Sequence, residues 1–146
     1  MPSREYSLER FIEAQARVYA DVIAELRVGR KTSHWMWFVF PQLRGLGRSA
    51  AAQFYGIQNL DEARAYLGHP LLGARLVECT GLVLDHPTRT AHEIFGSPDD
   101  LKLRSSMTLF DAASPARANV FVEVLTVFYA GEPDRKTLEL LASPLE

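Results

Sequence analysis

The segment from residue 29 to residue 42 concentrates side chains that could bind or transform a ligand. It reads GRKTSHWMWFVFPQ and contains both tryptophans of the chain. Four polar side chains accompany them: Arg30, Lys31, His34 and Gln42. Burying such groups beside so much apolar surface is unfavourable unless they find partners, so a packed core alone does not explain them. The basic pair could bind an anion, and an indole could stack on a planar ligand.

His34 is the candidate catalytic residue of this segment. A neutral imidazole could act as a general base or bind a ligand through a hydrogen bond. If Ser33 caps a short helix, His34 shares one helical face with Trp37 and Phe38, which follow three and four residues later. The alternative is a structural role, in which His34 lies at the edge of the core and binds a backbone carbonyl.

The two tryptophans are expected to differ in role. Trp35 and Trp37 would point to different sides of a helix, so at most one of them should line a pocket. The other would anchor the core. We take Trp37 as the stacking surface, because it would share a face with His34.

A second polar constellation lies in the stretch FGSPDDLKLRSSMTLF, residues 95–110. Ser97 and Pro98 are typical of a helix start, and Asp100 has the spacing of a capping box with Ser97. Leu103, Met107 and Phe110 would then face the core, while Asp100 and Arg104 could form a surface ion pair. The remaining polar face would carry Asp99, Lys102, Ser105 and Ser106. This face could bind a phosphate or carboxylate, or it could simply be solvated.

Charge is distributed unevenly along the chain. Between Arg27 and Leu60 there are five basic residues and no acidic one, although the whole chain has a net charge of -2. A local positive field of this kind could attract an anionic ligand. The alternative is that these residues are solvated or are paired with acids from elsewhere. The overall charge disfavours nucleic acid as a partner.

Helical spacing of apolar residues and capping residues predict helices along most of the chain. The longest begins at Ser7 and ends before Gly29. The others are expected at residues 33–41, 49–55, 59–67, 70–84, 90–95, 97–110, 120–129 and 133–141. No alternating strand pair with a tight turn is found. The sequence therefore predicts an all-α fold, a single compact domain of roughly eight helices with short loops and no sheet.

The composition limits the class of protein. With 47% apolar and 23% charged residues the chain resembles a soluble globular domain, here spanning residues 1–146 with a loose N-terminal tail at 1–6. No apolar run approaches the roughly 20 residues of a membrane helix. The single cysteine, Cys79, allows no internal disulfide and favours a reducing compartment, so we expect a cytoplasmic protein.

Recognised metal and cofactor motifs are missing from the sequence. His92 and Glu93 are not followed by the second histidine of a helical zinc motif, and His69 and His86 have no ligand spacing with them. Phosphate-cradling glycine loops and dinucleotide fingerprints are also absent. We therefore predict neither a metal site nor a bound cofactor.

Several stretches resemble an uncharacterised, all-helical family of bacteria and fungi that has sometimes been labelled calpastatin. The resemblance rests on residues 10–15, 29–42, 45–47, 69–76 and 95–110. It implies a helix rather than a buried strand at residues 35–40, and it implies no activity. Calpastatin itself is a disordered inhibitor, whereas this composition is that of a folded domain.

Together these observations predict a ligand-binding domain, with enzymatic activity left open. Its pocket would form where residues 30–42 meet residues 99–106, and would accept a small anionic or planar, nucleotide-like metabolite. His34 and Lys102 should then lie within about 10 Å of each other, a distance suited to a pocket for a small ligand. The alternative is a module that binds another protein through an exposed aromatic patch, formed by Trp35, Trp37 or Phe40.

Overall fold

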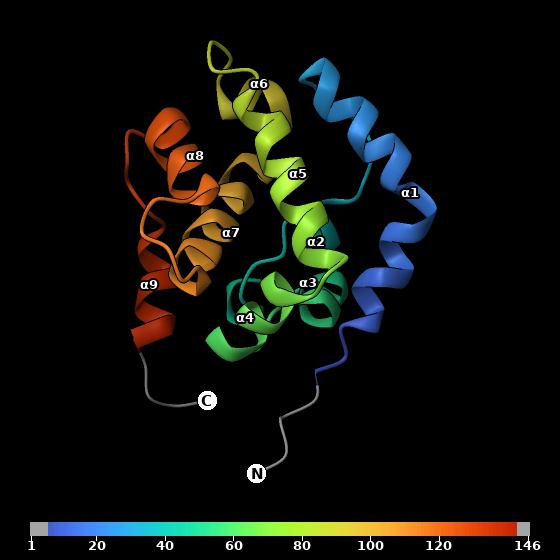
Figure 1. Cartoon of the computed structure of the whole chain (residues 1–146), viewed down its shortest axis with the longest axis vertical. Helices are drawn as coiled ribbons and strands as arrows, with labels where there is room; N and C mark the ends of the chain where they lie inside the picture. The colour runs from blue at the N-terminus through green and yellow to red at the C-terminus, as the bar shows by residue number, and fades with distance from the viewer. Residues whose placement is uncertain (1–5, 143–146) are drawn as a thin grey trace.

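The computed structural model describes residues 6–142, which form nine α-helices and one 3₁₀ turn (Figure 1). The α-helices are α1 (Glu9–Val28), α2 (Met36–Val39), α3 (Ala50–Tyr55), α4 (Leu60–Gly68), α5 (Leu72–Leu84), α6 (Ala91–Phe95), α7 (Asp99–Ala113), α8 (Val120–Tyr129) and α9 (Arg135–Ala142). The 3₁₀ turn η1 (Arg44–Leu46) lies between α2 and α3. Within residues 6–142 the only strand-like pairing is one isolated bridge, between Leu43 and Ile57. The prediction of an all-α fold without a sheet is confirmed.

Several helix boundaries lie where the capping residues predicted them. Gly29 ends α1 in the left-handed conformation, with φ of 83°. Asn59 accepts a hydrogen bond from the Glu62 N–H and begins α4. Thr90 and Glu93 form a complete capping box at the start of α6. These short-range signals set one end of each of α1, α4 and α6.

Other predicted caps are wrong, because the side chains concerned do not bind the helix ends. Leu8 rather than Ser7 precedes α1, and Pro98 rather than Ser97 precedes α7, in both cases without a side-chain hydrogen bond. Asp100 binds the N–H of Leu101 instead of reaching back to Ser97. α8, by contrast, begins at Val120 as predicted, and the side chain of Asn119 caps it by accepting a hydrogen bond from the Val122 N–H.

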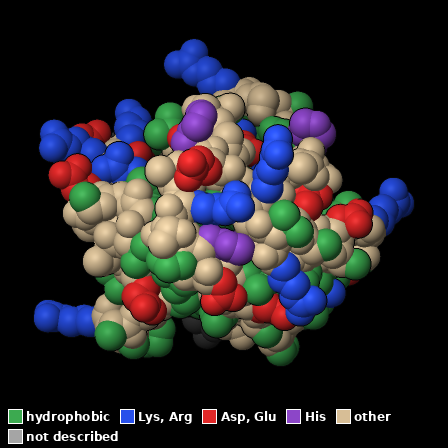
Figure 2. All heavy atoms as spheres, turned by 90° about the horizontal axis from the view of Figure 1, so that it is seen from above, with side chains coloured by type: hydrophobic (Ala, Val, Ile, Leu, Met, Phe, Trp, Pro, Cys, Tyr) green, Lys and Arg blue, Asp and Glu red, His purple; other side chains and the backbone are tan. Residues whose placement is uncertain are grey.

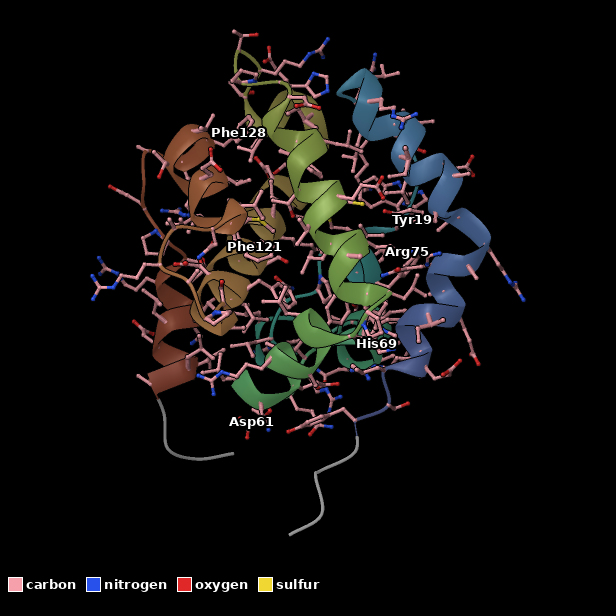
Figure 3. The ribbon with its side chains drawn as sticks, in the orientation of Figure 1. Tyr19, Asp61, His69, Arg75, Phe121 and Phe128 are labelled. Atoms are coloured by element: carbon pink, nitrogen blue, oxygen red, sulfur yellow. The ribbon has the colours of Figure 1, made fainter. Side chains whose placement is uncertain are left out.

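α5 lies in the middle of the molecule, between α1 on one side and α7 and α8 on the other (Figure 1). A line of aromatic side chains joins these layers through the core. The ring of Phe11 meets Tyr66 edge-on at 5.0 Å, Tyr66 lies 5.4 Å from Phe110, and Phe110 lies 5.9 Å from Phe121, which is labelled in Figure 3. α1, α4, α7 and α8 are therefore packed around one continuous core.

Polar groups between α1 and α5 fix the position of α2. Figure 3 shows Tyr19 and Arg75 facing each other, with the guanidinium 4.3 Å above the phenol ring. Arg75 also donates to the amide oxygen of the buried Gln15 at 3.3 Å. The Gln15 amide in turn donates to the carbonyl of Phe38 at 2.7 Å. Because that carbonyl belongs to α2, this network holds the short helix that carries Trp37.

Two expectations from the sequence concern the N-terminal tail and the lack of a membrane helix. The predicted loose tail falls mostly outside the described residues, but the Tyr6 hydroxyl donates to Asn59 at 3.2 Å. No helix within residues 6–142 combines the length and apolar character needed to cross a membrane.

Candidate ligand-binding site

The carboxylate of Glu25 orders the loop that leads from α1 into α2. It accepts hydrogen bonds from the N–H of Thr32 at 2.8 Å, the N–H of Ser33 at 3.0 Å and the indole Nε1 of Trp35 at 2.9 Å. The Ser33 hydroxyl also donates to it. Burial acts to raise the pKa of Glu25, but the hydrogen bonds from Ser33, Thr32 and Trp35 outweigh it and lower the pKa to about 2.

These contacts separate the roles of the two tryptophans. Trp35 is fully buried and lies 6.2 Å from Phe40 and 6.4 Å from Phe95, so it is a core residue. Trp37 is half-buried on the other side of α2 and lines a cavity. The prediction that at most one tryptophan lines a pocket is confirmed.

The cavity at Trp37 is formed by segments that are distant in the sequence. Its volume is about 430 Å³, within the range of small-molecule sites. α2, η1, α3, α7 and the first turn of α9, with the residue before it, contribute to it, and α9 packs against both η1 and α7. The polar side chains in its lining are those of Gln42, Arg48, Ser49, Lys102, Arg104, Ser105, Asp134 and Lys136.

Basic groups exceed acidic groups around this cavity. Arg48, Lys102, Arg104 and Lys136 line it, with Asp134 as the only acidic residue of the described lining. The carboxylate of Asp134 is already engaged, because it accepts hydrogen bonds from the N–H and the hydroxyl of Thr137 at the start of α9. Even with Arg104 paired to Glu132, basic groups remain in excess of acidic ones, so the cavity is positive and suited to an anion.

One carboxylate is shared by two lysines, of which Lys102 lines the cavity. Asp99 binds the ammonium of Lys31 at 2.8 Å and lies 3.7 Å from the ammonium of Lys102. The side chains are largely buried, with 7% of Lys31, 19% of Asp99 and 24% of Lys102 exposed. Lys102 also lies 4.6 Å above the ring of Trp37. The cluster thus carries one positive charge more than its own carboxylate neutralises.

The structure brings together half of the residues that the sequence singled out. Trp37, Gln42, Lys102 and Ser105 line the same cavity. Lys31 does not line it, but it reaches the cavity wall through Asp99.

The other three predicted residues lie elsewhere. Arg30 is exposed and does not line the cavity. Ser106 is fully buried behind the wall, and its hydroxyl has no hydrogen-bond partner among the described residues. His34 is exposed and also outside the lining, and α2 begins only at Met36. The helical face predicted for His34, Trp37 and Phe38 therefore does not form.

Two further expectations need correction. Arg104 does not pair with Asp100; it binds Glu132, with 3.5 Å between the charged groups, while Asp100 lies 3.4 Å from His92. The proposed aromatic patch is also largely absent, since Trp35 is 0% exposed and Phe40 only 1%. Packing inside the core uses both rings.

Charges are mixed at the end of the molecule where α6 lies. Figure 2 shows acidic, basic and hydrophobic side chains interspersed over this face, without a stripe of one sign. The positive character is thus a local property of the cavity at Trp37, not a general feature of the surface seen there.

Sequence reasoning missed four charged residues of the cavity as ligand-binding candidates. Arg48 lies in the acid-free window, which was the available signal for it. Arg104 lies on α7 beside Lys102, but it was assigned to an ion pair with Asp100. Asp134 and Lys136 gave no such signal, because they join the site only when α9 packs against α7 and η1.

Comparisons with known proteins concern the whole chain. A family model described as a protein of unknown function, DUF1810, matches residues 5–141. A crystal structure at 1.38 Å of the conserved hypothetical protein Rv1873 from Mycobacterium tuberculosis is 59% identical in sequence, with a TM-score of 0.92. The match covers 94% of this chain and 98% of that chain. No curated protein matches the sequence.

Proposed function

The chain belongs to the DUF1810 family of proteins of unknown function, and we propose that it binds a small anionic metabolite in the cavity at Trp37 and Lys102. The ligand is expected to carry a phosphate or carboxylate group and a planar, nucleotide-like part. The observation that carries this proposal is the ion cluster at the cavity, in which Lys102 of the lining shares the single carboxylate of Asp99 with Lys31 behind it.

The geometry of this cluster leaves Lys102 able to bind a second anion. Asp99 is closer to Lys31, at 2.8 Å, than to Lys102, at 3.7 Å. The other contact of the Lys102 ammonium is with the Trp37 ring, and a cation–π contact contributes only about 0.5–1 kcal/mol at an exposed site. A charge-assisted hydrogen bond to a phosphate oxygen is stronger than either contact. Arg48 and Lys136 would add to the attraction at the cavity rim.

The planar part of the ligand has two partners in the same cavity. The indole of Trp37 offers a stacking surface, and the side-chain amide of Gln42 offers both a donor and an acceptor. We assign no reaction to the site. His34 lies outside the cavity lining, so the proposal gives it no part in binding.

Isothermal titration with ribose 5-phosphate tests the anion site. The wild type should bind it, and Lys102→Met should bind at least tenfold more weakly, a difference of about 1.4 kcal/mol. Arg64→Gln is the matched control for loss of one positive charge, because Arg64 is 57% exposed on α4 and does not line the cavity. It should bind like the wild type.

Two checks keep the result interpretable. Lys31 still neutralises Asp99 in Lys102→Met, so the variant should fold, and its thermal unfolding verifies this. Lys136→Gln, at the exposed rim, should weaken binding without disturbing the wall. Equal affinity of the wild type and a folded Lys102→Met, or no binding to either protein, would refute the proposal.

A further inference from the structure

A narrow crevice adjoins the cavity between α2 and α3. Its walls include Met36, Trp37, Phe40 and Tyr55, and its free volume is about 10 Å³, roughly the space of one water molecule. Met36 and Phe40 are each 1% exposed, so this side of the crevice is part of the core. The crevice is therefore an apolar, aromatic recess that is nearly closed.

Lys102 and Trp37 form the boundary between the crevice and the cavity. Both residues line both spaces, as do Gln42 and Ala52. The Lys102 ammonium lies 4.6 Å above the Trp37 ring, where it covers one face of the indole. Removing the ammonium from this position would expose an aromatic face at the junction of the two spaces.

We propose that this junction is a ring-binding subsite for the base of a nucleotide, which Lys102 closes in the free protein and opens when it turns to the phosphate. The inference rests on the proposed function, because Lys102 leaves Trp37 only when an anion attracts it. The base then stacks on Trp37 in the place that the ammonium vacates, with one edge toward the crevice.

Only Lys102 has to move, because the backbone around the crevice is tightly packed. A Cβ added to Gly56 would lie 2.4 Å from the Cα of Arg44, and one added to Gly47 would lie 2.5 Å from the Cβ of Ala52. η1 and α3 are thus held in close contact. A long, flexible lysine at this boundary is the element that can change position at low cost.

Gln42 gives the subsite a means to recognise the edge of the base. Its side chain lines both the cavity and the crevice, so its amide lies at their junction. A glutamine amide pairs through two hydrogen bonds with an adjacent donor and acceptor, as on the N6 and N7 edge of adenine. The arrangement therefore points to a nucleotide rather than to a simple sugar phosphate, and adenine, which presents such an edge, is the base used to test it.

The test compares adenosine 5′-monophosphate with ribose 5-phosphate, which lacks the base. If the base stacks on Trp37, the nucleotide should bind the wild type about tenfold more tightly or better. Trp37→Leu and Gln42→Leu should each reduce this advantage, measured as the ratio of the two affinities within each variant, while ribose 5-phosphate still binds both variants through Lys102. Retained binding of the sugar phosphate also shows that the variants are folded.

The outcomes separate this inference from the function on which it rests. If ribose 5-phosphate binds in a Lys102-dependent manner but the nucleotide binds no more tightly, the ring subsite is refuted and the anion site stands. An advantage of the nucleotide that persists in Trp37→Leu would also refute the subsite. If neither ligand binds the wild type, both proposals fail.

Discussion

Replacing Glu25 by glutamine should destabilise the protein and loosen the loop that leads into α2. The carboxylate accepts hydrogen bonds from Thr32, Ser33 and Trp35, and a hydrogen bond to a charged group contributes about 1.5–3 kcal/mol. A pKa of about 2 in place of 4.5 corresponds to roughly 3 kcal/mol of stability at neutral pH. Because Glu25 is partly exposed to solvent and glutamine keeps one acceptor oxygen, we expect a loss of about 1.5–2 kcal/mol.

The difference in stability should also depend on pH. Because the folded pKa of Glu25 is lowered, its contribution is complete above the unfolded pKa of 4.5 and is lost as the pH falls through the folded value of about 2. The free energy of unfolding of the wild type should therefore approach that of Glu25→Gln between about pH 5 and pH 2. Urea unfolding, followed by tryptophan fluorescence at several pH values, measures both free energies.

Glu13→Gln provides the matched control for this experiment. Glu13 lies on the same helix but is exposed, and its substitution should change the free energy of unfolding by less than about 0.5 kcal/mol. The reasoning would be refuted if Glu25→Gln were as stable as this control at neutral pH. It would be refuted equally if the loss in Glu25→Gln were the same at about pH 3 as at about pH 7.

Two further predictions concern α5. Gly73→Ala should destabilise the protein by about 3 kcal/mol, because the added Cβ would lie 1.9 Å from the carbonyl oxygen of Leu67. Gly81→Ala in the same helix should stabilise the protein by about 0.5–1 kcal/mol, because its added Cβ would have no atom within 4 Å. Thermal unfolding compares the two variants, and equal shifts would contradict the packing described. Burial raises the pKa of the Cys79 thiol to about 12, so at about pH 8 a disulfide reagent should label it only as fast as the protein unfolds. Rapid labelling of the folded protein would show that the thiol is accessible.

The fold was predictable from the sequence where local chemistry decides the structure. Gly29, Asn59 and Thr90 act on backbone groups within a few residues, so their effect does not depend on the rest of the fold. The separation of Trp35 from Trp37 was also predicted, although Trp35 precedes α2 and does not lie within it. Ser97 shows the limit, since Asp100 finds nearer partners and the predicted capping box does not form.

The candidate site was only partly predictable, because its charges meet through tertiary packing. Asp99 and Lys102 were expected on one helical face, three residues apart, but nothing local shows that Lys31 joins them. Lys136 enters the cavity because α9 packs against η1 and α7. His34 illustrates the opposite error, because its neighbours in the sequence turn inward while its own side chain remains on the surface.

The two tryptophans allow the most direct test of the anion site. Each gives one indole N–H signal in a proton–nitrogen correlation spectrum, and Trp37→Phe assigns them. When ribose 5-phosphate is added, a phosphate bound by Lys102 should shift the signal of Trp37, because the ammonium lies 4.6 Å above that ring. The signal of Trp35, which is fully buried and bonded to Glu25, should stay in place. A Trp37 signal that does not move at a saturating concentration would contradict a ligand site in this cavity.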